Sequence, residues 1–252
     1  SRDRRRWSVR YRLGPKGFAA RSVRAQRLLD EHAAQVDVVM QFGATFKVCV
    51  PPTQPLVLYC DSNFEYSRDG AASGHSEASA LGPAESAGVR EREAAVYDSA
   101  SHIFTLSERL REVFIERFGI PHGNVETVYA GPNFDVSSTP ELPADRGAAE
   151  PVVLFVGRAF ERKGGPGLLE AFQIVRESLP NTRLLIMGPD ALPDTPDEAP
   201  DGIELLGFVD KSTPAGREML LETYRRAQVF CLPTQFEAFG IVYLEAMYYE
   251  LP

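Results

Sequence analysis

The feature that most constrains the fold is a regular alternation of segment types from residue 151 to the end of the 252-residue chain. Apolar runs typical of buried strands alternate with runs whose apolar residues recur at helical spacing. The expected strands begin at Val152, Thr182, Ile203 and Gln228, and the last expected helix begins near Gly240. This pattern predicts a parallel sheet covered by helices on both faces, the doubly wound arrangement. In such a fold, ligands bind beyond the carboxyl ends of the strands.

The first half of the chain has a looser version of the same pattern. Its strand candidates read "DVVMQF", "LVLYC", "HIFTLS" and "VETVYA", and a helix "ERLREVFIERFG" ends at Gly119, a residue typical of helix C-termini. These segments also predict a parallel sheet. Residues 67–88 are so rich in Gly, Ser and Ala that we expect a mobile loop there.

Composition also predicts where the two halves separate. Residues 136–150 have the Pro, Ser and charge content of an interdomain linker. We therefore expect an N-terminal domain over residues 1–135 and a C-terminal domain over residues 151–252. The chain begins without Met and stops directly after an expected helix, so we expect a fragment with both domains incomplete and with the strand "QVFCLP" at a sheet edge.

Charge and hydropathy narrow the function classes. A formal net charge of −8 argues against a surface that binds nucleic acid. Residues 1–27 nevertheless hold ten Lys and Arg against the single Asp3. We interpret this run as a solvated helix face or a frayed end; the alternative is contact with an anionic membrane or substrate. Because no secretion signal or membrane-length apolar run is present, we expect a cytoplasmic protein; the alternative is a protein peripheral to the inner face of the membrane.

Two stretches carry residues suited to chemistry. The turn "VGRAFERKGG" follows the strand at Val152 and offers Arg158, Lys163 and glycines ahead of a helix, which is a combination that can hold a diphosphate. The stretch "TQFEAFGIVYLEAM" places Glu237 at the same edge of the sheet and Glu245 on the following helix. The helix start at Gly240 offers backbone N–H groups to an anion. The alternative for each charged side chain is an exposed, solvated position.

The segments "GRAFERKGG", "LLIMGP", "LLGFV" and "FEAFGIVYLEAM" stand in this order and spacing. Together they resemble the C-terminal nucleotide-sugar domain of family 4 glycosyltransferases, whose signature is two Glu separated by seven residues. Upstream, "HIFTLSERLREVF" and "VETVYAGPNFD" resemble the end of the acceptor domain in the same family more loosely. The resemblance implies the GT-B fold, in which two Rossmann-like domains face a cleft, and a retaining transfer of sugar from a nucleoside diphosphate sugar to an acceptor hydroxyl.

The resemblance also implies residue roles. Arg158 and Lys163 would hold the donor diphosphate, Glu237 would bind hydroxyls of the donor sugar, and Glu245 would bind the ribose. A further set would line the donor through its backbone or beside the base: Gly157, Phe208, Val209, Ala238, Phe239, Gly240 and Ile241. No metal and no cofactor are implied, and the sequence has no Asp-x-Asp pair of the kind that holds a metal at phosphates.

The acceptor side is less defined. Asp61 and Asn63 follow the expected strand "LVLYC" and are the candidates there; the alternative is an Asx turn that closes the strand. The implied acceptor is a glycan or a lipid-linked molecule. Other functions stay open, namely another GT-B activity such as nucleotide-sugar epimerisation, or a non-catalytic protein that binds sugar nucleotides.

Overall fold

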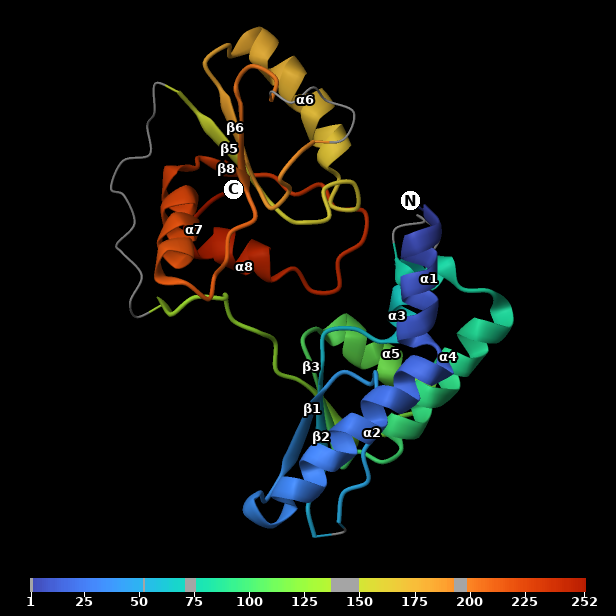
Figure 1. Ribbon diagram of the computed structural model, residues 1–252. Helices are drawn as coiled ribbons and strands as arrows, with labels where there is room; N and C mark the ends of the chain where they lie inside the picture. Colours follow the sequence, from blue (N-terminus) through green and yellow to red (C-terminus); the bar gives the residue numbers. More distant parts are fainter. Residues whose placement is uncertain (1, 52, 71–75, 137–149, 193–198) are drawn as a thin grey trace. The chain divides into compact units, whose positions relative to one another are not determined.

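The structure, a computed structural model, describes residues 2–51, 53–70, 76–136, 150–192 and 199–252. The chain divides into two units, Ser1–Ala130 (unit 1) and Gly131–Pro252 (unit 2). Each contains a four-stranded parallel sheet (Figure 1). The division falls five residues before the predicted start of the linker, and most of that linker lies outside the described residues.

Unit 1 has the strand order β1-β2-β3-β4. Its strands are β1 (Val39–Phe42), β2 (Leu56–Cys60), β3 (His102–Thr105) and β4 (Val125–Thr127). Its helices are α1 (Arg2–Leu13), α2 (Pro15–His32), α3 (Phe64–Asp69), α4 (Pro83–Tyr97) and α5 (Glu108–Phe118), with 3-10 turns η1 (Ala33–Gln35), η3 (Glu77–Ala80) and η4 (His122–Asn124). All four predicted strands are confirmed. The predicted helix end is also confirmed, since Gly119 caps α5 with a left-handed φ of 69°.

The predicted loop at residues 67–88 is wrong at both ends, because helix α3 extends to Asp69 and Pro83 begins helix α4. Proline suits the first turn of a helix, and the Gly82 N–H donates to the Glu85 carboxylate at 2.8 Å to cap the helix start. Helix α4 then buries Val89 and Val96. Ala84, Ser86 and Ala87, which indicated a loop, are therefore small positions in the first turns of a helix.

Helices cover only one face of the sheet in the described part of unit 1. Leu56, Leu58 and Cys60 alternate along β2 and are buried in a core cluster that also contains Val96 of α4 and Phe114 of α5. The intervening residues of β1, Met40 and Phe42, point to the other face and are 63% and 58% exposed. In the described part of unit 1, the helices of the core cluster therefore lie on the face opposite Met40 and Phe42.

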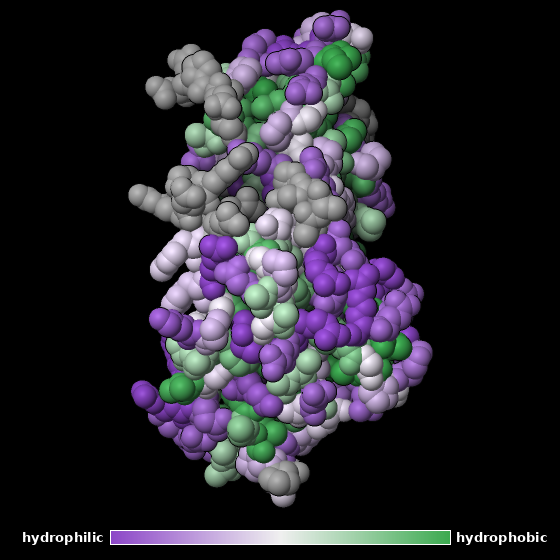
Figure 2. All heavy atoms as spheres, turned by 90° about the vertical axis from the view of Figure 1, so that its right-hand side faces the viewer, coloured by the Kyte–Doolittle hydropathy of each residue, from purple (hydrophilic) through white to green (hydrophobic). Residues whose placement is uncertain are grey.

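The basic N-terminal run forms helices α1 and α2. Phe18, Ala25 and Leu29 of α2 pack against the core of unit 1, so this helix is part of the fold. Figure 2 views the side of the molecule that lies on the right in Figure 1, where hydrophilic side chains alternate with scattered hydrophobic ones.

Unit 2 has the strand order β7-β6-β5-β8. Its elements are β5 (Val152–Val156), α6 (Gly165–Ser178), β6 (Arg183–Met187), β7 (Ile203–Gly207), α7 (Pro214–Arg226), β8 (Val229–Phe230) and α8 (Ile241–Tyr248). Leu168 and Phe172 of α6 pack on one face of the sheet, while Leu220 of α7 and Ala246 of α8 pack on the other. The doubly wound prediction is confirmed here, and β8 lies at the sheet edge as predicted.

The uncovered face of unit 1 generates a stability prediction. Met40→Lys places a charge on an exposed position, so we expect the free energy of unfolding to stay within about 0.5 kcal/mol and the soluble fraction to rise. Leu58→Ala, on the neighbouring strand and the covered face, should lose about 2–5 kcal/mol because it leaves a cavity in a closed core. Urea unfolding of both variants measures the difference. A large loss with Met40→Lys would show that this face is covered.

Candidate functional site

Two loops of unit 2 meet at the carboxyl ends of β5 and β8. These strands are adjacent and parallel, so their following loops leave the same edge of the sheet. Gly164 has a φ of 80°, and a Cβ there would collide with the Pro233 carbonyl, so only glycine allows this approach. Arg162 Nη1 donates to the Phe236 carbonyl at 2.9 Å and thereby joins the two loops.

Lys163 and Glu237 lie at this junction and form an ion pair in which the Lys163 ammonium donates to Oε2 of Glu237. Both side chains are largely covered, with 12% and 21% of their surfaces exposed. Burial, with a smaller contribution from Arg162, lowers the pKa of Lys163 to about 8. The ammonium is therefore mostly protonated at neutral pH, and it loses its proton as the pH rises above that value.

Two helices begin at the same edge. Helix α6 follows Gly164, helix α8 follows Gly240, and neither of these described N-caps supplies a side-chain hydrogen bond. The first N–H groups of a helix have no partner within the helix and lie at the positive end of its dipole. Gly240 has a φ of 86°. A Cβ added to it would lie 3.1 Å from Cγ of Glu237, so the absence of a side chain lets the two residues lie close together. At α6 the Gly165 N–H donates to the Phe160 carbonyl at 2.9 Å and Pro166 has no N–H, so the backbone donors beside the Lys163–Glu237 pair come chiefly from the start of α8.

Arg158 extends the site towards β7. Its guanidinium carbon lies 4.6 Å from the centre of the Phe208 ring, and both side chains are exposed. The Phe208 N–H donates to Oδ1 of Asp190 at 3.1 Å, which fixes the turn after β7. Val209 differs from its neighbour, because its side chain is only 8% exposed and belongs to the core. The side chain of Val209 therefore faces away from this edge.

Close backbone packing supports the turn after β5. Gly188 has a φ of 133°, and a Cβ on it would lie 2.6 Å from the Gly157 carbonyl. The Gly157 N–H donates to the Met187 carbonyl at 2.8 Å. Gly157 is thus held where the backbone turns away from the sheet. The remaining predicted backbone contributors, Ala238, Phe239 and Ile241, lie between Glu237 and the first turn of α8.

Glu245 is completely buried, although the resemblance assigns it a ligand. Its Oε2 accepts from the Tyr224 hydroxyl at 2.8 Å, and its Oε1 accepts from Lys211 Nζ at 3.2 Å and from the Asn133 N–H at 3.3 Å. Because both oxygens have donors and none of the residue is exposed, a direct contact with ribose requires Lys211 or Asn133 to move. In this structure Glu245 joins α8 to α7 and to the start of unit 2.

The candidates in unit 1 have different environments. Asn63 is the N-cap of α3: its Oδ1 accepts from the Tyr66 N–H at 2.8 Å, as in the Asx-turn alternative. Asp61 follows β2 and is half-buried, and burial raises the pKa of its carboxyl group. Asn63 therefore has a structural role, and Asp61 is the acceptor-side candidate that can still present its side chain.

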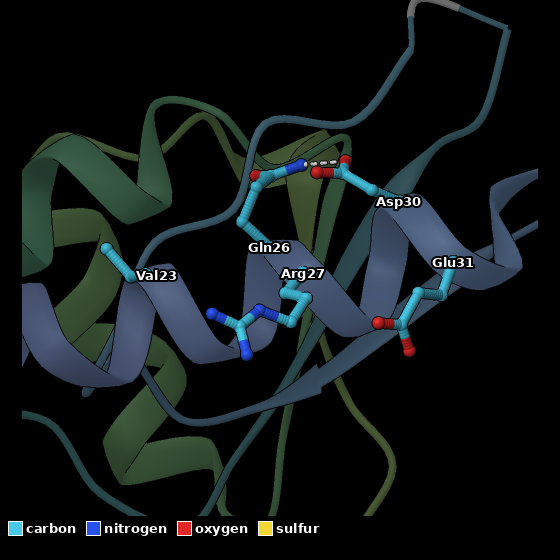
Figure 3. A pocket seen from close by; sticks show the side chains of 5 residues that line it. All are labelled: Val23, Gln26, Arg27, Asp30 and Glu31. Atoms are coloured by element: carbon cyan, nitrogen blue, oxygen red, sulfur yellow. Dashed lines mark hydrogen bonds between the residues drawn. The ribbon is translucent and has the colours of Figure 1, made fainter.

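Helix α2 has a hollow on its surface. A shallow hollow along α2 is lined by Val23, Gln26, Arg27, Asp30 and Glu31, and Gln26 donates to Asp30 at 2.8 Å (Figure 3). All five belong to one helix, so the hollow is the outer surface of α2. Among the described residues no group of three or more His, Cys, Asp and Glu could hold a metal ion. No described helix is long and apolar enough to cross a bilayer.

Sequence reasoning missed several residues that build the site. Arg162 joins the two loops, Lys211 and Tyr224 hold Glu245, and Asp190 fixes the turn at Phe208. Each of them acts through a partner that is distant along the chain. The sequence offered one signal for such packing, namely the glycines of "LLIMGP" and "ERKGG" at strand and loop ends.

Comparison with known proteins gives similar families. Residues 141–252 match the family model described as Glycosyl transferases group 1. The chain is 30% identical over 169 residues to a D-inositol 3-phosphate glycosyltransferase of Mycobacteroides abscessus, covering 63% of this chain and 37% of the relative. It is 28% identical over 171 residues to a mannosylfructose-phosphate synthase of Agrobacterium fabrum, covering 62% and 38%. The chain thus spans well under half the length of these relatives.

Solved structures agree on the fold. A UDP-forming alpha,alpha-trehalose-phosphate synthase from Burkholderia xenovorans has a TM-score of 0.61 at 15% identity, covering 93% of this chain and 61% of that one. A glycosyltransferase from Rickettsia africae has a TM-score of 0.56 at 13% identity, covering 94% and 62%. The fold is therefore the GT-B type, as the motifs predicted.

The buried Glu245 generates a stability prediction. Tyr224→Phe removes one donor from a fully buried carboxylate, and we expect unfolding in urea to show a loss of about 1–3 kcal/mol. Tyr248→Phe is the matched control, because its hydroxyl donates to the Val136 carbonyl at a more exposed place and should change stability by less than about 0.5 kcal/mol. Equal stability of the two variants would mean that the bond from Tyr224 does not stabilise unit 2.

Proposed function

We propose that this chain is part of a glycosyltransferase that moves a sugar from a nucleoside diphosphate sugar to an acceptor hydroxyl, with the donor bound by unit 2. The observation that carries the proposal is the meeting of Lys163, Glu237 and two helix N-termini at one edge of the sheet. The family of residues 141–252 supports it independently.

The diphosphate would lie between the starts of α6 and α8. Arg158 and Lys163 would neutralise its charge, and the first backbone N–H groups of α8 would donate to its oxygens. These donors stand in place before reaction, so they would stabilise the charge that develops on the leaving diphosphate. This arrangement would hold the donor without a bridging metal, as the family resemblance implies.

The Lys163–Glu237 pair gives the donor site a defined resting state. Each side chain compensates the other while the site is empty, which avoids two uncompensated charges in a largely covered position. On donor binding, the ammonium would turn to phosphate, and the Glu237 carboxylate would accept hydroxyl groups of the sugar. The exposed face of Phe208, opposite Arg158, would stack on the base.

The remaining assignments concern stereochemistry, Glu245, the acceptor and location; the resemblance supports them, and the contacts of Glu245 support its role. Transfer would retain the anomeric configuration. Glu245 would act as a positioning residue that orients α8 and Lys211, with contact to the ribose only after Lys211 or Asn133 has moved. In unit 1, Asp61 is the acceptor-side candidate. The acceptor would be a glycan or a lipid-linked molecule, the protein would be cytoplasmic, and the basic helices α1 and α2 would contact an anionic membrane.

Two substitutions separate the parts of the donor site. Lys163→Ala should weaken binding of a nucleoside diphosphate by about tenfold or more, because a charge-assisted contact is lost. Glu237→Gln should leave that affinity nearly unchanged and should weaken binding of the matching nucleotide sugar. Isothermal titration with a panel of nucleotides and nucleotide sugars measures both effects. The division of roles is wrong if Glu237→Gln lowers both affinities equally, and the site assignment is wrong if neither variant changes binding.

The lowered pKa of Lys163 predicts a pH dependence. Above a pH of about 8 the side chain loses its proton and its positive charge, so affinity for a nucleoside diphosphate should fall as the pH rises through this value. Lys163→Arg should abolish the dependence between about pH 6.5 and pH 9.5, because a guanidinium does not titrate there. A wild-type affinity that is flat over this range would contradict the prediction.

Contact of helices α1 and α2 with an anionic membrane can be tested by sedimentation with vesicles. The full chain should sediment with anionic vesicles and not with neutral ones, and less at high salt, because screening weakens surface attraction. Reversing the charge of the exposed Arg24 and Arg27 should lower the bound fraction. The nearby Asp30 and Glu31 oppose binding, so Asp30→Asn should raise it. Recovery of the protein in the supernatant under all conditions would remove membrane contact from the proposal.

A further inference from the structure

The residue beside Lys163 holds the backbone beside Glu237. Arg162 Nη1 donates to the Phe236 carbonyl at 2.9 Å, and the Lys163 ammonium donates to the carboxylate of Glu237. Two consecutive residues of one loop thus contact two consecutive residues of the other loop. The first contact fixes backbone, whereas the second fixes a side chain that the sugar donor would have to reach.

The bond from Arg162 determines how the Glu237 side chain leaves the backbone. The Phe236 carbonyl belongs to the same planar peptide group as the Glu237 N–H, so a donor that holds this oxygen also holds the plane that precedes Glu237. The Thr234 hydroxyl donates to the same carbonyl at 3.0 Å. Because a carbonyl oxygen has two lone pairs, these two donors leave the peptide plane little freedom to rotate.

Arg162 itself lies on an ordered turn. The Lys163 N–H donates to the Ala159 carbonyl at 2.9 Å, which closes the turn on which both basic residues lie. The Arg162 carbonyl accepts from the Gln235 N–H at 3.4 Å. Arg162 therefore contacts the second loop through its backbone as well as through its side chain.

The two contacts differ in what an incoming anion would do to them. A phosphate oxygen competes with the Glu237 carboxylate for the Lys163 ammonium, because both are anionic acceptors. Burial and, to a smaller extent, the charge of Arg162 lower the pKa of Lys163, so a second anion stabilises the charged form of this side chain. The bond from Arg162 to the Phe236 carbonyl does not use that ammonium, so it can stay when the ion pair opens.

We propose that Arg162 is a positioning residue for recognition of the donor sugar. By holding the peptide group between Phe236 and Glu237, it keeps the Glu237 carboxylate in place to accept sugar hydroxyls after Lys163 has turned to the diphosphate. This inference rests on the proposed function, because it requires a sugar donor at this edge of the sheet. It assigns the sugar to the Arg162–Phe236 contact and the diphosphate to Lys163.

The test compares nucleoside diphosphates with their sugar conjugates by isothermal titration of the full chain. The probes are UDP, GDP and ADP, each with its glucose and mannose conjugates. Arg162→Met should lower the affinity for a sugar conjugate by at least about tenfold, because a hydrogen bond from a charged group is lost. The affinity for the corresponding nucleoside diphosphate should fall by less than about threefold. Arg162→Lys, which keeps the charge without the planar fork, should have an intermediate effect on the conjugate.

Further variants separate positioning from stability. Arg176→Met removes a guanidinium that donates to the Pro180 carbonyl at 2.8 Å, where α6 ends at the opposite edge of the same sheet. This control should leave both affinities unchanged. Thr234→Val removes the second donor to the Phe236 carbonyl and should lower the affinity for the conjugate alone, by about two- to tenfold. Thr234→Ser keeps the hydroxyl and should bind the conjugate as the wild-type chain does.

A double variant tests whether Arg162 acts through Glu237. In the Glu237→Gln background, Arg162→Met should lower the affinity for the conjugate no further, because the two residues act on one contact. Losses that add in the double variant would overturn the proposal. So would a folded Arg162→Met chain in which the two affinities fall equally or not at all. If Arg162→Met does not fold, the comparison of Thr234→Val with Thr234→Ser decides in the same way.

The wild-type chain separates this inference from the proposed function. If it binds none of the probes, the proposed function is refuted, and the role of Arg162 with it. If it binds nucleoside diphosphates and none of the sugar conjugates, the role of Arg162 is refuted while the diphosphate site remains. If it binds both and Arg162→Met leaves the ratio of the two affinities unchanged, only the role of Arg162 is refuted.

Discussion

The pairing of β8 with β5 is the constraint on which the candidate site depends. Strand order runs from β5 outward to β6 and β7 and then returns to the other side with β8, so two loops from distant parts of the chain leave the sheet side by side. The contacts around the Lys163–Glu237 pair follow from this adjacency. The close approach of Gly164 to Pro233, the bond from Arg162 to Phe236 and the Lys163–Glu237 pair each join one loop to the other.

The helices cover the parallel sheet differently in the two units. In unit 2, α6 covers one face and α7 and α8 cover the other, which makes the edge at β5 and β8 a closed and ordered place. In the described part of unit 1, the helices lie on one face, and the strand β1 exposes Met40 and Phe42 on the other.

The sequence predicted the parts of the fold that depend on local pattern. The eight strands were identifiable because buried parallel strands are continuous apolar runs, and Gly119 marked a helix end because it takes a left-handed conformation. Helix α4 was missed because its alanines, serines and glycines conceal the spacing of Val89 and Val96. The site was predicted as a set of residues at one edge. Its internal pairing was not, because the Lys163–Glu237 pair and the burial of Glu245 depend on contacts between distant segments.

The central claim is that the Lys163–Glu237 pair is the resting state of a site that binds the diphosphate of a sugar donor. A crystal structure of the chain with a bound nucleoside diphosphate tests it most directly. We expect the diphosphate to lie between the first turns of α6 and α8. The Lys163 ammonium should donate to a phosphate oxygen and should no longer contact Glu237. A nucleotide bound elsewhere, or a diphosphate at this edge with the ion pair intact, would contradict it.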